Sequence, residues 1–150
     1  MKTIRNETHR RDLCSRLEKV TGEEKAAWGR MSVNQMVSHL VQTGTLPFEE
    51  TLPDRSNFLS RTLIKPLVLY VLPMPKEVPT PPDMDQQEKG RPPGDLAEDK
   101  RLAIEAINKV GTLSPDTPCK YHPFFGPMTP KQWGVIAHKH IDHHLRQFGV

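Results

Sequence analysis

A chain of 150 residues, 35% hydrophobic and 26% charged, is long enough for one ordinary domain with its own core and too apolar to be wholly disordered. Its net charge of +3 is small, and the charges are scattered, which argues against nucleic acid as a partner. The most apolar run, residues 66–74, is far shorter than the roughly 20 residues of a membrane-spanning helix, so no membrane partner is expected.

The first residues are polar and lack the apolar core of a signal peptide. Two cysteines, Cys14 and Cys119, occur in the chain, and neither lies in a paired motif. This pattern is typical of reduced thiols in a cytosol rather than of a disulfide framework. The sequence therefore predicts a cytoplasmic protein, in which Cys14 is a buried structural thiol between Leu13 and Leu17.

Five segments have helical character, and none reads clearly as a strand. The first runs from about 7 to 20, and the second spans 32–44, where Ser32 begins a capping box. The third covers about 57–72, with Pro66 expected to kink or interrupt it. Its apolar run is interpreted as a buried bundle helix rather than as a membrane-associated segment.

The fourth segment spans 95–111, with Asp95 as its N-cap, and the fifth runs from Thr129 to about 147. Residues 73–94 between the third and fourth are rich in proline and predict an extended crossover over the surface. The fold class is therefore all-α. Residues 1–150 are expected to form one four-helix-bundle domain with an extra short helix and a Pro-rich crossover.

Four of the seven histidines fall within residues 138–144, on the last predicted helix. Because successive helical residues are rotated by about 100°, His140 and His144 share the apolar side of this helix. His138 is placed on the opposite side and predicted to face solvent, like His9. His143 falls on the flank, where it is either a hydrogen-bonding partner of a metal ligand or an alternative ligand itself.

Two imidazoles one helical turn apart on a buried face can converge on one divalent cation. A third ligand must come from another helix, and His39 in the second segment is the natural candidate. Gln35 and Thr43 lie one turn to either side of it and are expected at a pocket mouth. The alternative is a pair of solvated histidines and a core histidine whose nitrogens are satisfied by the protein.

Three neutral histidine ligands leave a coordination position open, which is the pattern of catalytic rather than structural sites. Zinc or nickel suits such a site best, and iron or manganese also fits. The spacing offers no carboxylate base, because Asp142 is predicted to point to solvent. The catalytic residues stay unknown at this stage.

Residues 122–130, "HPFFGPMTP", have two interpretations. His122, Phe124 and Phe125 could form a wall over the metal pocket. Alternatively, the segment is a turn that packs two rings against the bundle, which is the favoured interpretation. Trp28 and Trp133 are predicted core residues.

Several of these stretches resemble a known family. "HIDHHLRQ" resembles the "HxxHHRGQ" signature of the DinB-like (damage-inducible) superfamily, and "WGRMSVNQMVSHL" resembles the segment that carries its first histidine. "HPFFGPMTPKQWG" and "HKHIDHHLRQFGV" are similar to the DUF1569 branch. The resemblance covers nearly the whole chain, with anchors at 28–40 and 122–150. One departure is Leu145, which precedes Arg146 and puts the signature's arginine and glutamine in doubt.

The resemblance implies an up-down-down-up four-helix bundle. It also implies that the superfamily's three metal-binding histidines fall on His39, His140 and His144, the residues that helical geometry selects. It further implies a metal-dependent enzyme on a small soluble substrate, resembling either a transferase that uses a low-molecular-weight thiol or a hydrolase. The alternative is a non-catalytic bundle that binds a small molecule or a partner, and a homodimer is a plausible assembly.

Overall fold

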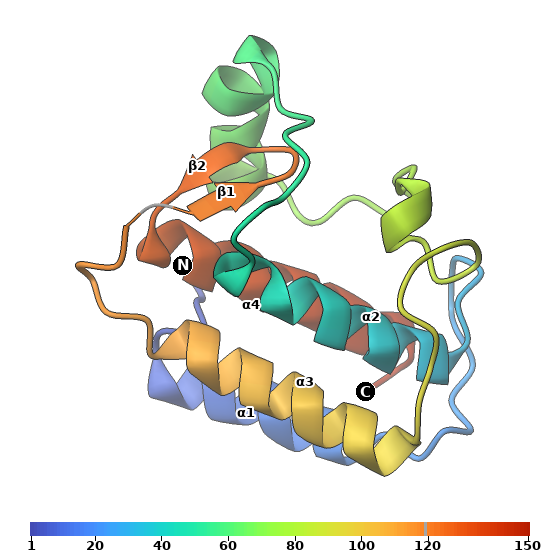
Figure 1. The fold of residues 1–150 in the computed structure, drawn as a ribbon. Coiled ribbons are helices and arrows are strands. Elements are labelled where there is room, and N and C mark those ends of the chain that lie inside the picture. Colours follow the sequence, from blue (N-terminus) through green and yellow to red (C-terminus); the bar gives the residue numbers. More distant parts are fainter. Residues whose placement is uncertain (119) are drawn as a thin grey trace.

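The structure, a computed structural model, describes residues 1–118 and 120–150 (Figure 1). It is mostly helical, as predicted. The α-helices are α1 (Glu7–Glu18), α2 (Val33–Thr45), α3 (Leu96–Gly111) and α4 (Pro130–Gln147). The short helical segments are η1 (Leu46–Phe48), η2 (Ser60–Ile64), η3 (Leu67–Val71) and η4 (Pro82–Met84), and the strands are β1 (Lys120–His122) and β2 (Gly126–Met128).

The predicted helix starts are confirmed at α2 and α4. At α2, the Ser32 side chain accepts from the Gln35 N–H, and the Gln35 side chain accepts from the Ser32 N–H in return. Thr129 and Gln132 form the same box at α4, where Pro130 occupies the first turn. These caps satisfy N–H groups that have no partner inside a helix, and they fix where both histidine-bearing helices begin.

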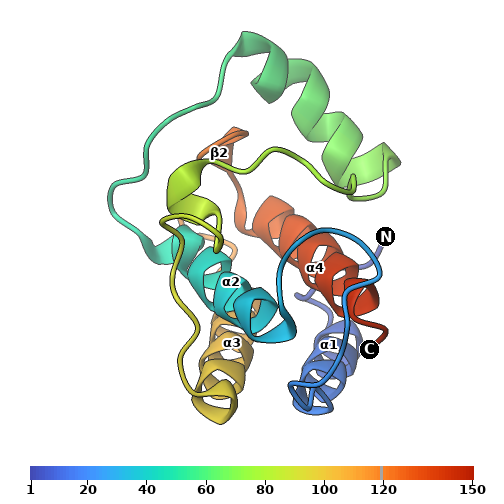
Figure 2. The same ribbon diagram turned by 90° about the vertical axis from the view of Figure 1, so that its right-hand side faces the viewer.

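The four α-helices pack around one aliphatic core (Figure 2). Helix α4 contacts α1, α2 and α3, and α3 also contacts α1 and α2. The fully buried side chains include Leu13, Leu17, Met36, Val37 and Leu145. Each buried aliphatic side chain of this size contributes about 1.5–3 kcal/mol. Cys14 is half-buried beside this core, and burial raises the pKa of its thiol, whereas Cys119 lies outside the described residues.

The expectation that the chain has no strand is wrong at residues 120–128. Strands β1 and β2 form an antiparallel hairpin in which Lys120 pairs with Met128 and His122 with Gly126. The Pro-Phe-Phe turn between them fits the predicted turn, and Gly126 closes it with a φ of 66°. Strands of three residues are too short to show the alternation by which a strand is recognised in a sequence.

The third predicted helix is present, but its predicted burial is wrong. Residues 58–71 are helical through Pro66, with π-helical bonding on both sides of it in η2 and η3. The segment lies outside the α1–α4 group (Figure 2). Phe58 is 82% exposed and Val71 is 70% exposed, although Leu69 is fully buried. Apolar composition predicted a core helix, whereas this segment packs against the domain through only part of its surface.

Lysine side chains hold this outlying segment in place. Lys139 of α4 donates through Nζ to the carbonyls of Val68 at 2.5 Å and Leu72 at 2.6 Å. These carbonyls belong to the last turns of the segment, where a cation offsets the negative end of the helix dipole. Lys65 donates in turn to the Pro127 carbonyl of the hairpin at 2.5 Å.

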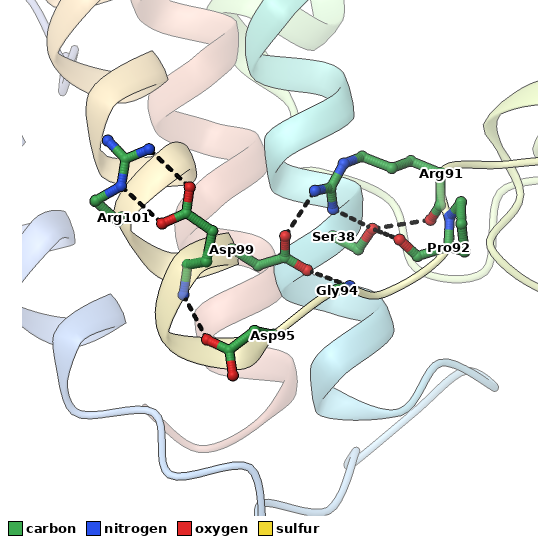
Figure 3. Close-up of polar contacts among 8 residues, drawn as sticks. Ser38, Arg91, Pro92, Gly94, Asp95, Asp99 and Arg101 are labelled. Carbon is green, nitrogen blue, oxygen red and sulfur yellow. Dashed lines mark hydrogen bonds and ion pairs between the residues drawn. The ribbon is translucent and has the colours of Figure 1, made fainter.

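The Pro-rich crossover, residues 73–94, is largely irregular, as predicted, and carries the short turn η4. Its end is fixed by a polar cluster that we call the Asp99 clasp: Ser38, Arg91, Gly94 and Asp99 (Figure 3). The Arg91 guanidinium meets the buried Asp99 carboxylate at 2.6 Å, and the Gly94 N–H donates to it at 2.8 Å. Within the described residues, no helix is both long and apolar enough to cross a bilayer.

Candidate functional site

Helices α2 and α4 bring three imidazole nitrogens together. The Nε2 atom of His140 lies 3.1 Å from Nε2 of His39 and 3.0 Å from Nε2 of His144. The ligand atoms of these three residues, which we call the histidine triad, all lie within 4.8 Å of one another. His39 and His144 are each 7% exposed, so the cluster sits inside the protein rather than on its surface.

Two glutamines fix the orientation of two of these rings. The Nδ1 atom of His39 lies 2.9 Å from Oε1 of Gln86, and Nδ1 of His144 lies 2.8 Å from Oε1 of Gln147. The glutamines are held by their own amide groups, since Gln86 donates to Gln42 at 2.7 Å and Gln147 donates to the Trp28 carbonyl at 2.6 Å. An amide oxygen only accepts, so each Nδ1 carries the proton.

The Nε2 atoms of His39 and His144 therefore present lone pairs, and both are directed at His140. One proton on Nε2 of His140 can make a linear hydrogen bond with one of them only. The Nε2 lone pair of the other histidine is then left without a donor, close to the His140 ring. A cation at the centre resolves this conflict, because a tetrahedral ion with bonds of about 2.0–2.1 Å holds its nitrogens roughly 3.3 Å apart. The three donors thus fit a divalent metal.

Burial keeps the triad uncharged. It lowers the pKa of His39, where the Gln86 hydrogen bond opposes the shift, and lowers that of His144 to about 3. The pKa of His140 falls well below its usual range, first through burial and then through the charges of the neighbouring histidines. Neutral imidazole is the form that binds a metal, so these rings need not lose a proton before binding one at neutral pH.

A cavity of about 870 Å³ adjoins the triad. That volume is within the range of small-molecule sites, and the lining is mostly apolar. Besides the triad, the lining residues include Met74, Met84, Phe124, Phe125, Trp133 and Ile136. Trp133 is buried and Trp28 is half-buried, and within residues 1–118 and 120–150 their indole nitrogens have no hydrogen-bond partner.

The other predicted pocket residues take different places. Thr43 lines the cavity, and its hydroxyl donates to the His39 carbonyl at 2.8 Å. Gln35 is not among the lining residues; it donates through Nε2 to the Gln86 carbonyl at 3.1 Å and so supports the partner of His39. His122 and His143 both line the cavity. The ring of His143 packs edge-on against Trp28 and His144, outside the triad.

The prediction that His138 faces solvent is wrong. Its side chain is 5% exposed and its ring lies 5.8 Å from that of His9. Asp142, on the same side of α4, is also partly covered and pairs with Arg16 of α1 at 2.7 Å. The apolar periodicity of α4 predicts a single buried face, but α1 also covers the face opposite the triad. A central helix has no fully solvated side.

Sequence reasoning assigned no role to either orienting glutamine: Gln147, the last residue of the signature, was left in doubt, and Gln86 was not considered. Gln147 carried a usable signal, because it lies three residues after His144 on the same helix and such pairs face each other. Gln86 carried none. It comes from the irregular crossover, 47 residues from His39, and only the fold brings the two together.

The fold and the triad together define a mostly helical protein with a candidate metal centre between two helices. The chain matches the profile of a protein of unknown function (DUF1569) over residues 6–149, and it therefore belongs to the DUF1569 family. Neither the search of curated proteins nor that of solved structures found a significant match.

Proposed function

We propose that this DUF1569 protein binds one divalent cation through the Nε2 atoms of His39, His140 and His144 and acts on a small soluble substrate in the adjoining cavity. One observation carries the proposal: three neutral imidazoles, two of them buried and that of His140 half-buried, direct Nε2 at a common point. Glutamine oxygens accept the Nδ1–H of the two buried rings. Metal-binding histidines are commonly oriented in this way.

Zinc or nickel suits the nitrogen-rich donor set best, with iron or manganese as alternatives. When bound, such an ion acts as a Lewis acid at its open position, toward either a thiol or a water molecule. The protein supplies the rest. The glutamines hold the rings, and the apolar wall of the cavity excludes water and receives the organic part of the substrate.

These roles support two reaction classes, transfer involving a low-molecular-weight thiol and hydrolysis. The packing of α1–α4 and the triad's origin on α2 and α4 support a DinB-like up-down-down-up bundle as the underlying fold. A cytoplasmic location and a homodimer stay predictions.

A second candidate function is binding without catalysis. It is favoured by the composition of the cluster, since no carboxylate of the described residues joins the three histidines. In this case metal removal lowers the melting temperature, and a screen of thiols with electrophilic acceptors shows no turnover.

Metal analysis of the purified protein tests the proposal. We expect about one equivalent of metal in the wild type and little in His39→Ala, His140→Ala or His144→Ala. His143→Ala is the matched control, because His143 lies on the same helix outside the triad, and it should keep its metal. Full metal content in any one of the triad variants removes that residue from the ligand set.

A further inference from the structure

His122 is a cavity-lining histidine with no part in the triad. It ends β1, and its ring stacks on Phe125 with centroids 4.6 Å apart and planes inclined by 25°. The Trp133 ring lies 5.3 Å away on α4. The hairpin and α4 therefore hold the imidazole between aromatic rings, which restricts its orientation.

The hydrogen bonding of His122 assigns its tautomer. The Phe124 N–H donates to Nδ1 of His122 at 3.1 Å, so Nδ1 carries a lone pair. The proton of the neutral ring then sits on Nε2. Burial, reinforced by the charge of Lys65, lowers the pKa of His122 to about 4, so the ring is neutral at physiological pH.

The Nε2–H group is a donor without a partner. Within residues 1–118 and 120–150, Nε2 of His122 makes no hydrogen bond. It is also not among the fully buried side-chain nitrogens without a partner there, which are those of Trp28 and Trp133, so it keeps some accessible surface. Nε2 of His122 is thus open to the cavity that the residue lines. His140 of the triad lines the same cavity.

The cavity that His122 lines is mostly apolar. Val68, Met74, Phe124 and Ile136 are among its lining residues. A polar group in an apolar wall costs free energy unless it is hydrogen-bonded. A donor fixed in such a wall selects a ligand that brings its own acceptor.

We propose that the Nε2–H of His122 is a ligand-binding group that donates a hydrogen bond to a carbonyl or carboxylate oxygen of an apolar molecule bound beside the triad. The inference rests on the proposed function, because that function places the substrate in this cavity. It narrows the substrate to an apolar compound with an exposed oxygen acceptor.

Two variants separate the donor from the shape of the ring. His122→Phe keeps an aromatic ring among aromatic neighbours and removes the donor. His122→Gln places an amide N–H near the position of Nε2 and keeps the donor. Both variants lose the acceptor for the Phe124 N–H, so the comparison between them isolates Nε2–H.

The experiment is calorimetric titration of the full-length protein with benzoate, an apolar ring with a carboxylate, and with toluene, which has no acceptor. We expect the wild type and His122→Gln to bind benzoate with similar affinity, and His122→Phe to bind it roughly 10–100-fold more weakly, the range for a hydrogen bond to a charged group. All three should bind toluene equally. Long-range ¹H–¹⁵N spectra should show protonated Nε2 and unprotonated Nδ1 in His122.

Equal benzoate affinity in His122→Phe and the wild type overturns the proposal, as does a protonated Nδ1. A parallel loss of toluene binding also overturns it, because the cavity rather than the donor would then have changed. Titrations are run on zinc-loaded and metal-free protein, with metal content measured in each. A wild type that takes up no zinc refutes the proposed metal site, while the metal-free titrations still decide the role of His122.

Discussion

Within residues 1–118 and 120–150, the Asp99 clasp and the histidine triad are both largely buried polar clusters, and they differ in how completely they are paired. In the Asp99 clasp, the carboxylate of Asp99 accepts from Arg91 and Gly94, and the Ser38 hydroxyl donates to the carbonyls of Arg91 and Pro92 (Figure 3). In the histidine triad, two Nδ1 atoms are paired, but three Nε2 atoms face one another. The polar groups of the clasp are paired within the chain, whereas the Nε2 atoms of the triad are placed so that they could hold a metal ion.

This difference distinguishes polar groups that stabilise the fold, as in the Asp99 clasp, from polar groups that are proposed to bind a ligand, as in the histidine triad. A satisfied buried cluster contributes to stability and orders a loop, here the end of the crossover. A buried lone pair that has no hydrogen-bond donor costs free energy, and under the proposed function a bound cation would remove that cost at the triad. The two clusters should therefore respond differently to metal, to mutation and to acid.

The largest expected effect is metal-dependent stabilisation that runs through the triad alone. Zinc at 1,000 times its dissociation constant should raise the unfolding free energy of the wild type by about 4 kcal/mol. Asp99→Asn should show the same increase from a lower starting point, and His140→Ala should show none. Thermal unfolding with and without zinc measures all three. A zinc response that survives in His140→Ala contradicts the separation of the two clusters.

Breaking the clasp should reduce stability without touching metal content. In Asp99→Ala the Arg91 guanidinium and the Gly94 N–H lose their acceptor, which should cost about 1–3 kcal/mol. Urea denaturation gives the change, and metal analysis should return the wild-type stoichiometry. Glu98→Ala is the control: Glu98 pairs with Arg101 on the exposed face of α3, and its loss should have little effect. Equal destabilisation by both variants would show that burial of the clasp does not matter.

Weakening one orienting glutamine should lower metal affinity but leave the site present. Gln86→Met keeps the side-chain length and removes the acceptor for Nδ1–H of His39, so zinc affinity should fall roughly 10–100-fold at unchanged stoichiometry. Competition with a chelator measures this. Gln87→Met is the neighbouring control, because Gln87 bonds to Gln35 and the Arg30 carbonyl rather than to a triad ring. A full loss of metal in Gln86→Met would instead indicate that the crossover, residues 73–94, had detached from α2.

The smallest effect is an acid-dependent one. Burial would raise the pKa of Asp99, but hydrogen bonds from Arg91 and Gly94 outweigh it and lower this pKa below 3.8. A carboxylate with a lowered folded-state pKa adds stability above its unfolded pKa and loses it as pH falls through the folded value. The difference in stability between metal-free wild type and Asp99→Asn should therefore begin to shrink as pH falls through about 4 and vanish once the pH is below the folded-state pKa of Asp99. Urea midpoints between pH 2 and pH 6 test this, and a constant difference across the range would contradict it.

The sequence predicted the parts of the site that depend on helical period. His140 and His144 are one turn apart, which places them on one face whatever the fold, and His39 lies on a helix that an identifiable capping box begins. The mostly helical class and the capped starts of α2, α3 and α4 followed from the same local rules. The triad's closeness is thus a consequence of α2 packing against α4.

The remaining features depend on contacts that no local pattern encodes. His138 is buried because α1 covers the far side of α4, and much of residues 58–71 is exposed because the segment lies outside the α1–α4 group. Gln86 reaches His39 from an irregular segment that is held to α2 by hydrogen bonds from Gln35 and to Gln42. Periodicity predicts which side of a helix is apolar, but it does not count how many neighbours that helix has.

The contact between Gln86 and His39 gives the crossover a role that connecting loops seldom have. Surface loops usually tolerate insertions and deletions, because nothing inside the protein depends on their length. Here the ring orientation of a core histidine depends on where residue 86 lies. That position is set by hydrogen bonds to Gln35 and Gln42 of α2 and by the anchorage of the same loop at Arg91. Shortening or lengthening the segment between these two residues would rotate an imidazole in the interior without altering a single residue of the interior.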